Sequence, residues 1–459
     1  MPLTRRTFFQ TLAAASLSTA ADRPKRNMIV RSDHPQDLEM PLDGFDDWIT
    51  PIDRFYVRSH HYTPTVNLAE WRLKIDGEVE QPLTLTMDDL KRMPKVELVG
   101  VMECAGNGRS LFEPPVAGAQ WAYGSVGNGR WTGVRLADVL ARVKVKNGAQ
   151  HVLFDGADVP IGTMPEFKRT ITVPKALHPD TLLAYQMNGE TLPVAHGFPL
   201  RLIPSGWAGD SWVKWVTNIT VLNHEFDGFF MKTAYRHPGK PVPPGSAVDP
   251  ATMHPVESLR IKSLISAPVD DSRTLPGKPV RIHGVAWGGE SPVRNVEVSV
   301  DNGRTWQAAK LGGQPSKYGW RLWELNWTPP QAAYYTIMAR AFDEKGQTQP
   351  LAQEWNPSGY LNNTVQRVGI NVTTEPAPVE PANAKTATSV PTEFKQPAGY
   401  KQACLACHNE DMMQQQRLTR VQWEREVDKM VRWGAKVNPP DRDALVDYLF
   451  HLYGPRPQR

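Results

Sequence analysis

Two cysteines and a histidine near the C-terminus form the pattern in this chain that is most typical of chemistry. Cys404, Cys407 and His408 have the spacing Cys-x-x-Cys-His. This is the attachment pattern of a c-type haem, in which the two thiols bond to the porphyrin and the adjacent histidine ligates the iron. A zinc half-site would need a second Cys/His pair nearby, and a thioredoxin-like redox pair would not need the histidine. The motif therefore predicts a covalently attached haem c.

A second axial ligand to this haem is expected from the residues that follow the motif. Met430 lies on the next predicted helix, just before a Gly-Ala helix stop. A methionine at helical spacing is often a core residue, but a His/Met pair suits electron transfer. Met430 is therefore the predicted sixth ligand and His451 the main alternative. Met412 and Met413 lie too near His408 in sequence to reach across the ring easily.

The third cysteine, Cys104, stands alone in the segment Glu-Cys-Ala-Gly-Asn-Gly-Arg-Ser, directly after a strand-like run. A soft thiolate on a glycine-containing loop, with Arg109 five residues on, suits ligation of a soft, high-valent metal beside an oxyanion. Nearby cations would favour the thiolate. The alternative is an inert cysteine buried in a turn.

Length and composition limit what the rest of the chain can be. The 459 residues suggest two to four domains. With 40% hydrophobic and 22% charged residues, the bulk is expected to be globular. The net charge of +4 gives no reason to expect a nucleic-acid partner. No stretch of the sequence contains the roughly 20 consecutive apolar residues that a membrane-spanning helix needs. The 41 prolines argue against long helices over most of the chain.

The N-terminal residues are typical of an export signal. Arg5 and Arg6 lie in a Thr-Arg-Arg-Thr-Phe-Phe pattern, followed by a weakly apolar stretch and small residues. Residues 1–21 are therefore predicted to be a twin-arginine leader, removed from a periplasmic protein. An ordinary N-terminal helix is the alternative. Because this pathway moves folded proteins, it also favours a cofactor inserted before export.

Two sheet-containing regions are expected to position Cys104. Over residues 22–250, period-two runs at 71–75, 97–102 and 151–154 alternate with short helix starts at 87–90 and 136–140. This predicts a mixed α/β domain. Residues 251–372 hold period-two runs at 261–265, 280–287, 293–300 and 334–341, with turn signals between them. They predict an immunoglobulin-like β-sandwich, so that the overall class is α+β.

The haem motif belongs to a third, smaller region. Residues 373–397 contain Pro among Thr, Ala and Glu and predict a stiff linker. In residues 398–459, two apolar stripes predict an all-α unit, one formed by Trp423, Val427, Met430 and Val431 and the other by Leu445, Leu449 and Leu452. With the Cys/His motif, this region resembles small class I cytochrome c domains.

Further motifs accompany Cys104 in a fixed order. They are Phe55–His60, Cys104–Arg109, Trp131–Val134, His178–Asp180, His196–Arg201, Val213–Trp215 and Val298–Trp306. Through them, about residues 45–370 resemble the sulfite oxidase family of molybdenum–pterin enzymes. The resemblance implies a molybdopterin domain followed by an immunoglobulin-like domain through which two chains form a homodimer.

The resemblance also implies roles for individual residues. Cys104 would be the protein ligand of molybdenum. Arg58 and Arg109 would hold the substrate oxyanion with forked donors, beside Tyr235 and Trp121. The pterin and its phosphate would contact His60, His196, Arg201, Ser211 and Lys214. Each of these residues alone also has an ordinary structural interpretation, and it is their joint order that favours the site.

The implied reaction is the oxidation of sulfite to sulfate, with electrons passing through the chain's own haem to an external cytochrome c or similar acceptor. Two departures from the animal enzymes concern the substrate pocket. Gly108 precedes Arg109 where they carry two arginines, and Ser358 stands where they carry arginine. Arg367 is considered as the missing substrate arginine. The departures are closer to bacterial sulfite dehydrogenases and sulfane dehydrogenases. The alternatives are therefore a sulfane dehydrogenase acting on carrier-bound sulfur and an electron carrier without molybdenum chemistry.

Overall fold

The computed structural model of the chain describes residues 27–375, 396–397 and 399–455. The predicted leader, residues 1–21, and most of the predicted linker, residues 373–397, lie outside the described residues. Within these ranges the fold is rich in sheet, and the longest helix has 13 residues, as the proline content predicts. No helix in the described part of the chain is both long enough and apolar enough to cross a membrane.

Two sheets, the first antiparallel and the second mixed, form the region that carries Cys104. The first has the strand order β10-β9-β6-β5, with β11 also paired to β9, and the second has the order β4-β3-β12-β7-β8. Their bounds are β5 Val96–Glu103, β6 Val126–Arg135, β9 Thr181–Met187, β10 Glu190–Thr191, β11 Arg201–Pro204, β3 Leu73–Gly77, β4 Leu83–Leu85, β7 His151–Gly156, β8 Arg169–Thr172 and β12 Val216–Leu222. The strand predicted from the period-two run at 71–75 forms as β3, which begins two residues later than the run.

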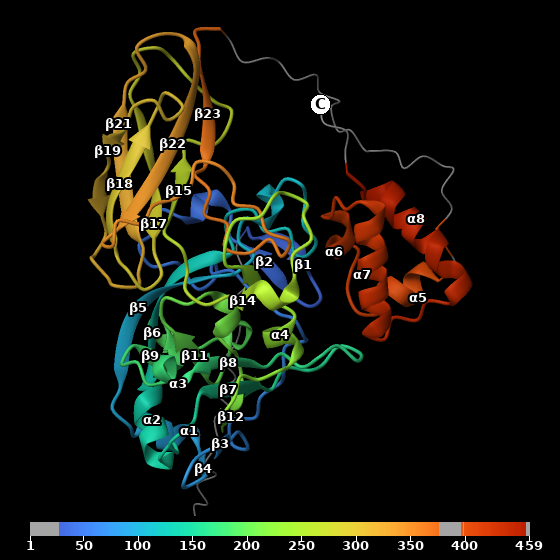
Figure 1. Ribbon diagram of the computed structural model, residues 1–459. Helices are drawn as coiled ribbons and strands as arrows, with labels where there is room; N and C mark the ends of the chain where they lie inside the picture. The colour runs from blue at the N-terminus through green and yellow to red at the C-terminus, as the bar shows by residue number, and fades with distance from the viewer. Residues whose placement is uncertain (1–26, 376–395, 398, 456–459) are drawn as a thin grey trace, which may run out of the picture.

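Short helices connect and cover these sheets (Figure 1). They are α1 Met87–Lys91, α2 Leu136–Val143, α3 Val173–Ala176 and α4 Phe229–Lys232. Helix α1 starts at Thr86, whose hydroxyl accepts a hydrogen bond from the amide of Asp89 while the Asp89 carboxylate accepts one from the amide of Thr86. Helix α2 buries Leu136, Val139, Leu140 and Val143 against the sheets. These caps and stripes explain why both sequence-predicted helices form.

The chain enters this region through an N-terminal arm, residues 28–40, which contains the antiparallel strands β1 Ile29–Ser32 and β2 Asp37–Glu39. A backbone bridge between Leu38 and Val57 fastens β2 beside the segment that carries Arg58. A second small hairpin joins β13 Arg236–Pro238 to β14 Met253–Pro255. It follows directly after Tyr235.

Two further sheets form the sandwich predicted for residues 251–372. Their orders are β15-β17-β21-β20 and β16-β23-β22-β18-β19. Apolar side chains from both sheets, among them Ile282, Trp323, Val296 and Ile337, pack into one core. The bounds are β15 Lys262–Ala267, β17 Val280–Trp287, β21 Arg321–Trp327, β20 Lys310–Gly312, β16 Ser272–Thr274, β23 Arg367–Val372, β22 Ala333–Asp343, β18 Val293–Ser299 and β19 Gln307–Ala308.

Residues 399–455, named here the C-terminal helical segment, contain α5 Tyr400–Cys404, α6 Asp411–Gln414, α7 Arg420–Arg432 and α8 Arg442–Tyr453. Their apolar faces meet in a separate core. Trp423 and Val427 are buried as the stripe predicts, but Val431 is 40% exposed. Figure 1 shows this segment, in red, beside the β1–β2 arm, and the β7–β8 loop extends toward the segment.

Candidate active site

Cys104 lies where strand β5 ends, on a loop that backbone hydrogen bonds hold on both sides. Its amide donates to the carbonyl of Ser125 at 2.9 Å, and its carbonyl accepts from the amide of Asn107 at 2.9 Å. The side chain is 8% exposed and lines two neighbouring cavities. Arg58, His60 and Tyr235 line the same two cavities. Four of the predicted site residues therefore meet at one place.

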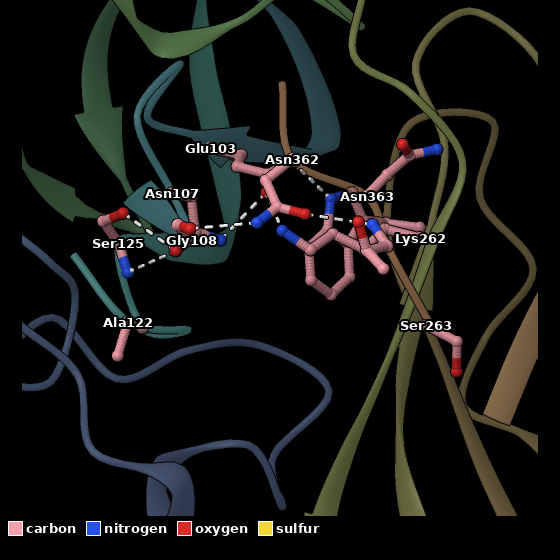
Figure 2. A network of polar contacts seen from close by, with 12 residues as sticks. Glu103, Asn107, Gly108, Ala122, Ser125, Lys262, Ser263, Asn362 and Asn363 are labelled. Carbon is pink, nitrogen blue, oxygen red and sulfur yellow. Dashed lines mark hydrogen bonds and ion pairs between the residues drawn. The ribbon is translucent and has the colours of Figure 1, made fainter. Parts of the chain in front are cut away.

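Polar contacts from the sandwich region fix the Cys104 loop (Figure 2). The carboxylate of Glu103 accepts hydrogen bonds from Lys262 at 3.0 Å, from Asn107 at 2.9 Å and from the Trp287 indole at 2.8 Å. Asn362 donates to the carbonyl of Gly108 at 2.9 Å. The loop is therefore anchored by residues that follow it by more than 150 positions in the chain, which sequence inspection did not identify.

The smaller cavity has a volume of about 50 Å³ and a cationic lining. Lys214 donates to the hydroxyl of Ser59 at 2.8 Å and to the carbonyl of Ala195 at 3.2 Å. Burial, together with the positive charge of Arg201, holds the pKa of Lys214 well below its usual value. Burial likewise lowers the pKa of Arg201 to about 10. Arg58, Arg201 and Lys214 share this lining with the carboxylates of Asp158 and Asp210. A bound anion would favour the charged forms of the three cations.

The donors around this cavity fit a phosphate-bearing pterin. Arg201 is in the lining, and Ser211 lies between the lining residues Asp210 and Trp212 in the chain. Over the described residues, the hydroxyl of Ser211 and the Nε of Arg201 have no hydrogen-bond partner, although both atoms are buried. Buried polar groups are usually paired, and an anion would satisfy both donors. His196 is 1% exposed and lines the same cavity.

Burial and nearby cations act in opposite directions on the Cys104 thiol. Burial raises its pKa to about 11, and this outweighs the opposing positive charges of Arg58 and Arg109. In the absence of a metal the side chain is therefore a neutral thiol. A metal would have to displace its proton, as for thiol ligands in general.

Arg109 extends across the larger cavity, which has a volume of about 460 Å³. Its guanidinium donates to the carbonyl of Ala119 at 3.1 Å and to that of Ser358 at 3.3 Å, and it lies 5.0 Å from the ring centre of Tyr360. Three glycines pack closely against it: Gly106, Gly118 and Gly359. The guanidinium is therefore held in one orientation, and its buried Nε has no partner among the described residues.

Tyr235 lines both cavities and contacts two further residues of their walls. Its hydroxyl is 2.7 Å from His60 Nε2, and its ring stacks on Tyr360 with centroids 5.2 Å apart. The backbone of Tyr235 has a φ of +54°, which is uncommon for a bulky residue. Burial, with the nearby charge of Arg58, holds the pKa of His60 well below its usual value, so the imidazole is neutral. Tyr360 is a wall residue that the sequence did not reveal.

Trp121 and Arg58 complete the walls of the larger cavity. Trp121 is fully buried, and its indole N–H has no partner among the described residues. Arg58 is paired: its Nη1 lies 3.2 Å from each carboxylate oxygen of Asp37. Arg367, in contrast, is exposed, bonds to the carbonyl of Leu351 and lies outside the lining. The position of Arg367 therefore rules it out as a substrate arginine here.

The Cys-x-x-Cys-His residues line the same larger cavity. Cys404, Cys407 and His408 face it together with Met430. Met412 and Met413 are also in its wall, whereas His451 is exposed on α8 and is not. Apolar side chains from the helices, including Val427, Leu445 and Leu449, surround the space. The donor set and this apolar surround fit a haem, and Met430 lines the same space as His408.

Direct contacts hold the helical segment against this site. Tyr62 donates to the carbonyl of Cys407 at 3.1 Å. The amide of Thr163, on the β7–β8 loop, donates to the carbonyl of Trp433 at 3.1 Å, and Phe229 packs edge-on to the Trp433 ring. The cavity is therefore enclosed by both parts of the chain.

Comparisons with known proteins agree with this arrangement. Residues 60–230 match the oxidoreductase molybdopterin binding domain family, and residues 253–373 match the Mo-co oxidoreductase dimerisation domain family. These matches, with the buried cysteine loop, define the class: a molybdopterin-dependent oxidoreductase.

Relatives make the assignment more specific. Mitochondrial sulfite oxidase of Macaca fascicularis is 35% identical over 77% of this chain and 67% of its own length. Sulfite oxidases of Gallus gallus and Arabidopsis thaliana are 33% and 32% identical, covering 79% and 92% of those proteins. The sulfane dehydrogenase SoxCD of Paracoccus pantotrophus matches in structure with a TM-score of 0.66 at 26% identity, over 80% of this chain and 96% of that one. The chain belongs to the sulfite oxidase family and is an oxidoreductase acting on sulfur compounds.

Proposed function

We propose that this protein is a molybdenum-dependent sulfite dehydrogenase that carries its own covalent haem c. One observation supports this above all: Cys104, Arg109 and Trp121 line the same cavity, of about 460 Å³, as Cys404, Cys407 and His408. A substrate pocket and a haem attachment motif that share one cavity suit an enzyme whose electrons leave within the same chain.

In this proposal, the substrate anion binds between Arg109 and Arg58. A forked guanidinium matches the oxygens of an oxyanion, and the glycines around Arg109 hold its fork in place. Cys104 would hold molybdenum, which supplies two-electron oxidation of sulfur while water supplies the added oxygen. Tyr235, hydrogen-bonded to a neutral His60 at 2.7 Å, offers a hydroxyl at the same place. Trp121 limits the room beside the anion.

The pterin and its phosphate would be held by His60, His196, Arg201 and Lys214, which line the smaller cavity, and by Ser211, which lies between the lining residues Asp210 and Trp212 in the chain. The haem would be held by Cys404 and Cys407, with His408 and Met430 as axial ligands, and would pass electrons singly to an external cytochrome c or similar acceptor. Linking both groups in one chain replaces encounter between separate proteins by a high effective concentration.

The test is to mix purified, oxidised protein with free sulfite under anaerobic conditions and follow the reduced haem bands in a stopped-flow cell. Rapid reduction that is abolished in Cys104→Ser is the expected result. Dithionite should still reduce the haem of that variant, which controls for the haem itself. Absence of reduction by sulfite, in protein that contains molybdenum and a reducible haem, would contradict the proposal.

A sulfane dehydrogenase is the second candidate function, favoured by the structural likeness to the Paracoccus pantotrophus enzyme. Ser358 in the cavity wall adds to this candidate, because it leaves more room than the arginine expected from the resemblance. A carrier-borne sulfur adduct would then reduce the haem in the stopped-flow experiment where free sulfite does not.

We further propose periplasmic export by the twin-arginine route and a homodimer formed through the sandwich. The export proposal is supported by the sequence of residues 1–21, and the dimer by the family match of residues 253–373. Fractionation of cells, with replacement of Arg5 and Arg6 by lysine, tests the first. Analytical ultracentrifugation of the purified protein tests the second.

A further inference from the structure

Strand β2 brings two buried carboxylates to the substrate site. Asp37 is 0% and Glu39 1% exposed, and as residues two apart on a strand they point the same way. The arm that carries them precedes both family-matched regions, the first of which begins at residue 60. Burying two carboxylates is costly unless each is fully bonded, so their contacts indicate what the arm does.

Asp37 is bonded to the segment that carries Arg58. Its Oδ1 accepts a hydrogen bond from the amide of Ser59 at 3.1 Å, and both of its oxygens lie 3.2 Å from Arg58 Nη1. Arg58 Nη1 also donates to the carbonyl of Ser59. One end of the guanidinium fork is therefore fixed, while the side chain as a whole remains 24% exposed and in the cavity wall.

Glu39 is bonded to the loop that follows Trp121. Its Oε1 accepts from the amides of Ala122 and Gly124 at 2.9 and 2.8 Å, and its Oε2 pairs with Arg31 at 2.6 Å. These amides directly follow Trp121. The same short strand thus anchors both Arg58 and the loop that follows Trp121.

The two carboxylates differ in the position of the cation that each of them faces. Glu39 is neutralised by Arg31 of its own arm, away from the cavity lining. Asp37 instead places its negative charge against a cation that faces the cavity. It therefore orients Arg58 and also reduces the net attraction of that wall for an anion.

We propose that Asp37 is a positioning residue that sets the affinity of the site for sulfur oxyanions, through the orientation and charge of Arg58. The inference rests on the proposed function for the identity of the anion. It concerns a residue that the family-matched regions do not include.

The test compares Asp37→Asn and Asp37→Ala with the wild-type full-length holoenzyme. Asp43→Asn is the matched control, because Asp43 follows the same strand but is 69% exposed and lies 3.5 Å from Arg54 outside the cavity. The dissociation constant of sulfate is measured calorimetrically in each protein. The KM and kcat for sulfite are measured beside it.

Asparagine keeps an oxygen that can accept from Arg58 and Ser59 but removes the charge. Sulfate should bind Asp37→Asn about fivefold more tightly, as loss of one nearby, partly screened charge predicts, with a lower KM. Alanine removes the positioning bonds as well, so its KM should rise about tenfold and its sulfate affinity should fall. Asp43→Asn should match the wild type.

Sulfate affinities within twofold of the wild type in both Asp37 variants would overturn the inference, and so would equal weakening in both. Asp37→Asn keeps the buried hydrogen bonds and thus serves even where Asp37→Ala unfolds. If free sulfite fails to reduce the wild-type haem but sulfate follows the expected order, the proposed function fails and the role of Asp37 stands.

Discussion

The ammonium of Lys262 lies 3.0 Å from the carboxylate of Glu103 and ties strand β15 of the sandwich to the residue that precedes Cys104. Both side chains are almost fully buried, at 7% and 8% exposed. The sandwich therefore holds the cysteine loop directly, in addition to the dimer contact proposed for it.

Replacing Lys262 by methionine should destabilise the protein and reduce its molybdenum content. The change leaves the Glu103 carboxylate buried without its cation, which typically costs about 3–5 kcal/mol. Denaturant unfolding and metal analysis measure the two effects. Lys317→Met is the control, because its pair with Asp180 is 49% and 36% exposed and should contribute less than about 1 kcal/mol. Full stability and metal content in Lys262→Met would contradict this role.

Replacing Gly359 by alanine should weaken substrate binding through Arg109. A Cβ at this position would lie 2.9 Å from the Cγ and 3.0 Å from the Nε of Arg109, and the backbone φ is +63°. The KM for sulfite should rise about tenfold as the forked contact is lost, with about 1–2 kcal/mol of lost stability from backbone strain.

Gly346→Ala separates the two effects of the Gly359 change. Gly346 has a φ of +80°, but a Cβ there would meet no atom within 4 Å. It should therefore lose similar stability while its KM stays at the wild-type value. An equal rise of KM in both variants would show that strain, and not contact with Arg109, is the cause.

Local sequence signals predicted much of this architecture. Helices α1 and α2 and the strands of the sandwich follow from short-range periodicity and caps. The burial of single residues was predicted less accurately where it depends on distant neighbours. Val431 fits the helical stripe but is 40% exposed, because the core of the segment forms on the face of Trp423 and Val427.

The residues of the site were predictable where a motif carried them, and their partners were not. Cys104, Arg58 and Arg109 stand in recognisable segments. Asp37 and Lys262 reach the site only through tertiary contacts across 21 and 159 residues of sequence. Arg367 shows the opposite error, because its place in the chain suggested a role that its exposed side chain cannot fill. Spacing alone does not show which side chains share a cavity.

Docking of the helical segment should depend on a glutamine pair. The Gln416 amide donates to the carbonyl of Gly118 at 2.9 Å and accepts from Gln120 at 3.3 Å, and both glutamines are buried. Gln416→Leu removes both of these bonds and the one to the carbonyl of Met412, at about 0.5–1.5 kcal/mol each. Sulfite should then reduce the proposed haem roughly tenfold more slowly, while dithionite reduces it at the same rate.

Gln402→Leu is the control for the docking prediction, because Gln402 is exposed on α5. The proposed haem of this variant should be reduced at the wild-type rate both by sulfite and by dithionite. Slower reduction by dithionite in Gln416→Leu would indicate damage to the helical core instead of loss of docking.

Met430 and His451 give opposite expectations for the proposed haem. Met430 lines the cavity together with His408, whereas His451 is exposed on α8. Methionine ligation raises a haem potential. Met430→Leu should therefore lower the potential on the order of 100 mV, within the roughly 0.8 V that axial ligands span. His451→Ala and Met412→Leu should leave it unchanged. A potentiometric titration followed by haem absorbance measures all three, and a shift in His451→Ala with none in Met430→Leu would assign the ligand to the histidine.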